Sequence, residues 1–164
     1  MPVQLRSKKD VFVSIVTTLS VIFFDRLTKI FFTQILLYGE SIPVIKGVFH
    51  FTLVHNTGIA FGMFKNQGIV FIIIPVIAVI LLIFNIYYYR QNNDVLSSGY
   101  IFAFSLILGG AIGNLYDRIA FGHVIDFIDL RVWPVFNIAD SAITIGAVIV
   151  AFKCFQLSEW EKKT

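Results

Sequence analysis

The sequence predicts an all-α membrane protein, with four transmembrane helices and a small β-rich segment on the extracytoplasmic side. Hydrophobic residues make up 57% of its 164 residues and charged residues only 14%, whereas water-soluble domains carry about 25% charged residues. Four segments are apolar over roughly the 20 residues that a bilayer span requires. Between the first two of them, β-branched and aromatic residues alternate in the manner of strands.

The four predicted spans follow one another in a single domain without internal repeats. The first begins after several basic residues, as a signal peptide does, but it has no small-x-small cleavage site and continues past Asp25 and Lys29. We therefore interpret it as a retained span. The expected spans cover residues 11–37, 69–89, 99–115 and 136–157.

Basic residues predict the orientation, because they collect on the cytoplasmic side of a membrane protein. The larger set lies at the two chain ends and after the second span: Arg6, Lys8, Lys9, Arg90, Lys153, Lys162 and Lys163. The smaller set consists of Lys46, Lys65, Arg118 and Arg131. We therefore expect both termini in the cytoplasm and the two long loops, about 38–68 and 116–135, on the outer side.

The first outer loop has a structure of its own in this prediction. From Ser41 to His55, β-branched and aromatic residues alternate around Gly47, which indicates a small hairpin or sheet. Unpaired strand edges do not occur in hydrocarbon, so we expect this sheet at headgroup depth or above.

Two aspartates near the carboxyl end are the strongest functional signal. Asp126 lies in the middle of an apolar, strand-like run, and Asp140 opens the fourth predicted span. A carboxylate is costly at such a position unless the protein uses it, and two carboxyls that share one proton can activate water. We therefore predict an aspartyl peptidase with this pair as its catalytic groups. Asp129 borders the polar Arg131, so we interpret it as an ordinary loop charge.

Two asparagines have roles that follow from their place in the chain. Asn137 is predicted to cap the fourth helix, with Asp140 three residues later. The positive helix end would favour ionised Asp140, which leaves Asp126 as the better candidate for the shared proton, although a coupled pair titrates together. Asn56 either caps a turn or donates a hydrogen bond to a substrate carbonyl.

Charged residues of the first and third spans have alternative interpretations. Asp25 and Lys29 lie four apart on one helix face, which predicts an ion pair. Arg26 and Lys29 could instead extend to lipid headgroups. Asp117 and Arg118 either pair with each other at the interface or anchor the second outer loop.

Other hydrolytic chemistries lack their motifs in this sequence. The chain has no His-Glu-x-x-His helix for zinc hydrolysis and no Gly-x-Ser-x-Gly elbow for a serine nucleophile. Nothing local organises a pair of Ser141 with Lys29, and the single Cys154 gives neither a disulfide nor a cysteine metal cluster. We expect no metal and no cofactor.

The alternative from another class is a small, non-enzymatic, proton-coupled transporter that uses the same acids as a relay. A relay would string acids across the membrane, whereas the candidate acids all gather at the outer side: Asp25, Asp117, Asp126 and Asp140. The net charge of +3, without a basic stripe, suits lipid headgroups and not nucleic acid.

Five motifs occur in order along the chain: Asp25-x-x-x-Lys29, His55-Asn-Thr-Gly-Ile-Ala-Phe61, Gly113-Asn-Leu-Tyr-Asp-Arg118, Val124-Ile-Asp-Phe127 and Phe136-Asn-Ile-Ala-Asp140. Over about residues 11–157, they resemble the bacterial lipoprotein signal peptidase family, signal peptidase II. The resemblance implies an aspartyl endopeptidase of the bacterial cytoplasmic (inner) membrane, with its active site near the outer face. It implies a prolipoprotein substrate that carries diacylglycerol on the cysteine after the cleavage site. Membrane lipids are the other expected partner, and we expect a monomer.

The resemblance also implies roles for individual residues. Asp126 and Asp140 fall on the catalytic pair. A substrate-binding set comprises Asn56, Asn114, Arg118 and Asn137, and a structural set comprises Asp25, Lys29 and Asp117. The family fold has four transmembrane helices with a small periplasmic β-cradle. Ile59 is a departure, because many members have alanine there.

Overall fold

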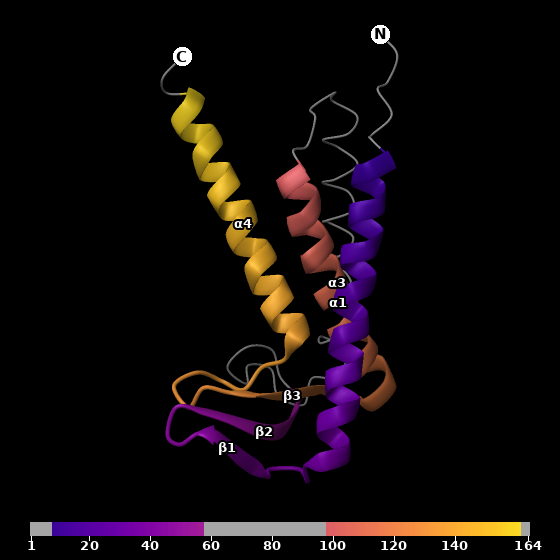
Figure 1. Ribbon diagram of the computed structural model, residues 1–164, viewed down its shortest axis with the longest axis vertical. Coiled ribbons are helices and arrows are strands. Elements are labelled where there is room, and N and C mark those ends of the chain that lie inside the picture. The colour runs from indigo at the N-terminus through magenta and orange to yellow at the C-terminus, as the bar shows by residue number, and fades with distance from the viewer. Residues whose placement is uncertain (1–7, 58–97, 162–164) are drawn as a thin grey trace.

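The computed structural model describes residues 8–57 and 98–161, which form three helices and one three-stranded sheet (Figure 1). In chain order the elements are α1 (Lys8–Ile35), β1 (Ser41–Ile45), β2 (Phe49–Asn56), α3 (Ser98–Phe121), β3 (Val124–Asp129) and α4 (Ile138–Glu161). The helices occupy the first, third and fourth predicted spans. Two stretches, Lys9–Ile35 and Ser98–Phe121, are long and apolar enough to cross a membrane. The predicted second span, 69–89, lies outside the described residues.

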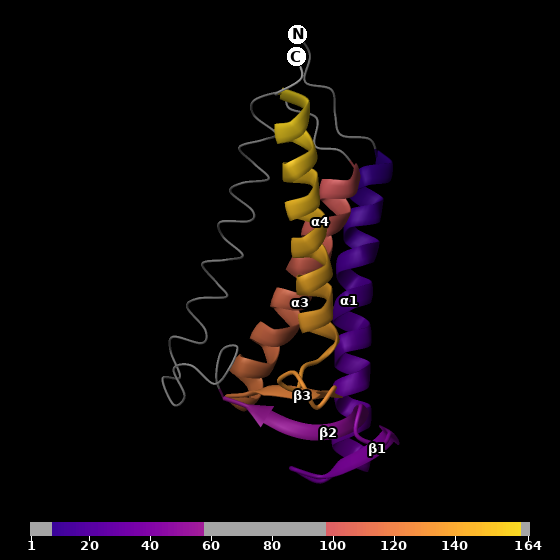
Figure 2. The same cartoon turned by 90° about the vertical axis from the view of Figure 1, so that its left-hand side faces the viewer.

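Helix α3 lies between α1 and α4 and packs against both of them (Figures 1 and 2). Glycines on α3 make this close packing possible. A Cβ atom added at Gly109 would lie 2.8 Å from the Cβ atom of Val21 on α1, and one added at Gly110 would collide with the carbonyl oxygen of Ala139 on α4. Small residues therefore set the distance between α3 and its two neighbours.

The burial pattern is inverted relative to that of a water-soluble protein. Large apolar side chains are exposed along α1, among them Phe12, Leu19 and Phe23. The largest fully buried side chains of the described residues, apart from Phe127, are polar or charged: Lys29, Asn137, Asp25, Asp117 and Asp126. Polar groups that are expensive in lipid therefore face one another inside the bundle.

The antiparallel sheet, in the order β1-β2-β3, lies across one end of the helix bundle (Figures 1 and 2). The hairpin predicted around Gly47 is confirmed, and this glycine has the positive φ (79°) that its turn requires. Aromatic packing fixes the sheet to α1, because the rings of Phe32 and Phe127 stack with centroids 4.3 Å apart. The apolar core beneath the sheet consists of Phe32, Leu36, Leu53, Ile125 and Phe127.

The helix ends differ from the predicted spans by one to six residues. Helix α1 ends at Ile35, two residues before the expected end of the first span, and α3 continues through Phe121, so the loop predicted from residue 116 begins later. Helix α3 passes the charged Asp117 because this side chain is paired inside the bundle. The helix ends where Gly122 takes a positive φ (75°) and donates its N–H to the carbonyl of Arg118 at 3.1 Å.

Candidate active site

The two predicted aspartates meet where the sheet covers the helix ends. Strand β3 carries Asp126, which is 1% exposed, and the first turn of α4 carries the partly buried Asp140. Pairing of β3 with β2 places Asp126 opposite Val54. The sheet and the start of α4 therefore supply one carboxyl each to the same small region.

One side chain, that of Asn137, contacts both segments. Its Oδ1 atom accepts the N–H of Asp140 at 2.9 Å, and the Asp140 carboxylate accepts the N–H of Asn137 at 3.2 Å. This reciprocal arrangement confirms the predicted helix cap. In addition, Asn137 Nδ2 donates to Asp126 Oδ1 at 2.7 Å. The helix cap is therefore also the bridge between the two aspartates.

Two further amides complete the coordination of these carboxyls. Asn56 Nδ2 donates to the second oxygen of Asp126 at 2.9 Å, and Asn114 Nδ2 donates to Asp140 Oδ1 at 2.7 Å. Asn56 is the last residue of β2. Because its side chain binds Asp126, its role is not simply to cap a turn. Each of the four carboxyl oxygens thus accepts a hydrogen bond from an amide N–H.

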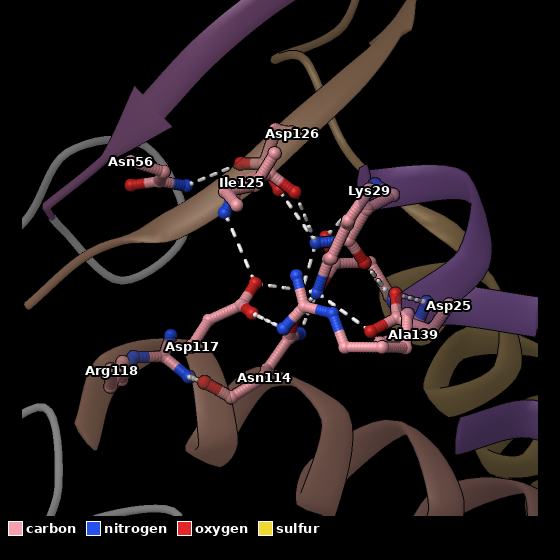
Figure 3. Close-up of polar contacts among 12 residues, drawn as sticks. Asp25, Lys29, Asn56, Asn114, Asp117, Arg118, Ile125, Asp126 and Ala139 are labelled. Carbon is pink, nitrogen blue, oxygen red and sulfur yellow. Dashed lines mark hydrogen bonds and ion pairs between the residues drawn. The ribbon is translucent and has the colours of Figure 1, made fainter. Parts of the chain in front are cut away.

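A buried cluster of charges surrounds Lys29 (Figure 3). The Nζ atom of Lys29 is 2.8 Å from a carboxyl oxygen of Asp25 and 2.8 Å from one of Asp117, and it donates to Asn114 Oδ1 at 3.0 Å. The predicted pair of Asp25 with Lys29 is confirmed. The alternative in which Lys29 reaches lipid headgroups is wrong, because its side chain is 0% exposed.

The partners of Asp117 decide between the two interpretations made for it. It pairs with Lys29 and with Arg26, whose Nη1 atom lies 2.7 Å from Asp117 Oδ1, and not with its neighbour Arg118. Its Oδ2 atom accepts the N–H of Ile125 at 3.2 Å, so it anchors the second outer segment as the other interpretation held. Arg118 is partly buried, and it donates to the Asn114 carbonyl at 3.4 Å.

The cluster holds the main chain immediately before each aspartate. Asp117 accepts the N–H of Ile125, the residue before Asp126. Asp25 accepts the N–H of Ala139, the residue before Asp140, at 3.0 Å. Two helix carboxylates, joined through one lysine, therefore fix the backbone at both positions. The bond of Asp117 follows the predicted anchoring of the second outer loop, whereas sequence spacing carried no signal for the bond of Asp25 to Ala139, 114 positions away.

Burial dominates the electrostatics of Asp126. Burial first, and then the negative charge of Asp140, raise the pKa of Asp126 from 3.8 to about 7, against the opposing effects of Asn56, Lys29 and Asn137. This carboxyl therefore holds a proton at a much higher pH than an exposed aspartate does.

Asp129 behaves differently from Asp126, although it lies on the same strand. Burial raises the pKa of Asp129, but hydrogen bonds from Thr52 (2.7 Å) and from the N–H of Arg131 (2.8 Å), with the positive charge of Arg131, outweigh that effect and lower it. Asp129 also pairs with Arg131 at 3.5 Å. It is thus an ionised residue of the sheet, engaged with partners other than those of the aspartate pair.

The structure also places the residues of a serine–lysine pair, an alternative chemistry for which the sequence has no local support. Ser141 donates to the Asn137 carbonyl at 2.9 Å, and Lys29 is occupied by two carboxylates, so they do not form a nucleophile–base pair. Among residues 8–57 and 98–161, no group of three or more histidine, cysteine or acidic side chains could hold a metal ion.

Comparisons with known proteins agree on one family. The family model described as Signal peptidase (SPase) II matches residues 17–156. A lipoprotein signal peptidase of Halothermothrix orenii is 43% identical over 144 residues, which cover 86% of this chain and 94% of the relative. A lipoprotein signal peptidase of Caldanaerobacter subterraneus subsp. tengcongensis is 44% identical over 140 residues, covering 85% and 93%. A bacterial membrane enzyme solved by the in meso method at 2.3 Å resolution has a TM-score of 0.82 and 32% identity, with 92% of each chain covered.

Proposed function

The chain belongs to the signal peptidase II family, and we propose on this premise how its residues carry out the reaction. It is an aspartic-type peptidase that removes the signal peptide from lipoprotein precursors. We assign the catalysis to Asp126 and Asp140. The observation that carries this assignment is that the side chain of Asn137 binds both the Asp126 carboxyl and the main-chain N–H of Asp140, while the Asp140 carboxylate accepts the N–H of Asn137.

In the proposed mechanism the two carboxyls divide the acid and base work. Near neutral pH the pair holds one proton, and the high pKa of Asp126 makes it the better candidate for that proton. Ionised Asp140 takes a proton from a water molecule, whose oxygen attacks the peptide carbonyl. Protonated Asp126 donates a hydrogen bond to the carbonyl oxygen as negative charge develops there. A proton then passes to the leaving amine as the peptide bond breaks.

We divide the four residues expected to bind substrate into two pairs. Asn137 is 0% exposed and Asn114 is 5% exposed, and the amides of both are engaged with carboxyls. Their proposed role is therefore to orient the pair. Asn56 and Arg118 are only partly buried, and we propose that they contact the main chain or the headgroup oxygens of the substrate.

The proposed substrate carries diacylglycerol on the cysteine after the cleavage site. Exposed apolar side chains along α1 support a protein surrounded by acyl chains, and an active site at the sheet end of the helices suits a lipid-anchored bond. The proposed arrangement is four transmembrane helices in the cytoplasmic membrane, with both termini inside and the site near the outer face. Asp25 and Asp117 gather around Lys29 (Figure 3) and bind the main chain next to Asp140 and Asp126. Acids gathered in one cluster argue against a relay across the membrane.

The test of this assignment is cleavage of a lipidated precursor by the purified protein in detergent. Asp126→Asn and Asp140→Asn should each abolish cleavage, because neither amide can exchange a proton with water, while the protein still folds. Asp129→Asn is the matched control: it alters an acid of the same strand, and it should keep most of the activity. Full activity of Asp126→Asn or Asp140→Asn, or an inactive Asp129→Asn, would contradict the assignment.

A further inference from the structure

Contacts with helix α3 hold the side chain of Arg26 in one position. Its Nη1 atom lies 2.7 Å from Asp117 Oδ1, and its side chain is 25% exposed. Its Cζ atom lies 5.0 Å from the ring centroid of Tyr116 and 5.6 Å from that of Phe121, within the range of a cation–π contact. A carboxylate and two rings of α3 therefore hold the guanidinium.

The carboxylate that Arg26 binds has a second task. Asp117 Oδ2 is 2.8 Å from Lys29 Nζ and accepts the N–H of Ile125 at 3.2 Å. Arg26 therefore holds one oxygen while Lys29 and the β3 main chain share the other. Without Arg26, the carboxylate would be free to turn toward Lys29, and the bond to Ile125 would weaken.

Asp25 and Asp117, which hold the main chain before Asp140 and Asp126, differ in where their cations come from. Asp25, which holds the main chain before Asp140, has Lys29 on its own helix at 2.8 Å. Asp117 is on α3 and takes both of its cations, Arg26 and Lys29, from α1. The position of the main chain before Asp126 thus depends on a contact between two helices. Lys29 divides its charge between Asp25 and Asp117, whereas Arg26 pairs with Asp117.

We infer that Arg26 is a positioning residue for Asp126. Through Asp117 it fixes the amide of Ile125, and thereby the distance between the carboxyls of Asp126 and Asp140. This inference rests on the proposed catalytic role of Asp126. Small errors in such a distance are costly, because a displacement of about 1 Å can lower a rate by about 100-fold.

The test compares Arg26→Gln with the wild type as purified, full-length enzyme acting on a lipidated precursor. We expect kcat to fall by about tenfold with KM changed less than about twofold, because the substrate contacts remain. Amide hydrogen exchange of peptides that span β3 should become faster, because the bond of Ile125 to Asp117 weakens. Arg26→Lys keeps a positive charge for Asp117 but loses the planar group over the rings, so its kcat should lie between those of Arg26→Gln and the wild type.

Lys46→Gln is the matched control, because it removes the same charge from an exposed residue of the sheet hairpin. If Arg26→Gln fails to fold, Tyr116→Leu removes a ring beneath the guanidinium from a half-exposed position and should also lower kcat and speed exchange in β3. Unchanged kcat and exchange in Arg26→Gln, or an equal loss in Lys46→Gln, would overturn the inference. The proposed function fails separately: a fully active Asp126→Asn would remove the catalytic role while leaving the exchange result intact.

Discussion

Substitutions of Asn137 can separate its role in capping α4 from its role in catalysis. Its side chain is 0% exposed and makes bonds to Asp140, Asp126, Ile125 and Asn114. Replacement by alanine removes all of these bonds at once. We predict that Asn137→Ala is destabilised and nearly inactive.

The size of the stability loss follows from the individual bonds. The lost cap costs about 1 kcal/mol. The Asp126 oxygen and the Ile125 carbonyl lose a donor inside the protein, at about 1 kcal/mol each, whereas Asn114 Oδ1 keeps its bond from Lys29 at 3.0 Å. Asn137→Ala should therefore lose about 3 kcal/mol of unfolding free energy. Cleavage should fall by about 100-fold, because the side chain that links the Asp126 carboxyl to the main chain of Asp140 is lost.

Asn137→Ser is the matched control. A serine hydroxyl is as good a cap acceptor as asparagine, but it is too short to donate to Asp126 while it caps Asp140. The serine variant should therefore recover about 1 kcal/mol of stability and little activity. Denaturant titration and initial cleavage rates at the same pH measure the two quantities. A rate for Asn137→Ala within threefold of wild type, or wild-type activity in Asn137→Ser, would refute the bridging role.

Two other predictions concern protonation and helix packing. The folded-state pKa of Asp126 is about 7 against 3.8 for the unfolded chain, so between these pH values the folded state binds the extra proton, and stability falls as pH rises. Thermal unfolding should thus show Asp126→Asn to be more stable than the wild type at pH 8, by up to about 4 kcal/mol, but not at pH 4. An equal difference in stability at both pH values would contradict the raised pKa. Gly110→Ala should lower stability and cleavage because its Cβ meets the carbonyl of Ala139, whereas Gly122→Ala, in open space at φ 75°, should cost only about 1–2 kcal/mol and keep its activity. Equal losses of activity in the two glycine variants would count against this packing argument.

Local signals in the sequence were sufficient for several parts of the site. The hairpin around Gly47, the cap at Asn137 and the ion pair of Asp25 with Lys29 each depend on residues within a few positions of one another. Turn chemistry, capping and helical spacing are rules of short range, and these features obey them. The apolar strand around Asp126 was recognisable for the same reason.

Contacts between distant segments could not be predicted from these short-range rules. Arg26 and Asp117 are 91 positions apart, and Asp25 lies 114 positions from the amide of Ala139 that it binds. Spacing predicts which neighbours on one helix can pair, but it does not say which helix supplies the partner of a buried charge. This is why Asp117 was given Arg118 as a candidate partner, and why the end of α3 was placed too early.

The division of charges between α1 and α3 has a consequence for the order of assembly. When α1 emerges during synthesis, the half of it nearer the sheet carries one acid, Asp25, against two bases, Arg26 and Lys29, and so this half has a surplus positive charge. Helix α3 brings Asp117 and Arg118 as a neutral neighbouring couple. Docking of α3 brings Asp117 to Arg26 and Lys29, which neutralises the surplus, and the positive charge of Arg118 then lies near Asp140 and Asp126. Assembly of the bundle thus places a second positive charge, that of Arg118, near the aspartate pair only once the helices are in register.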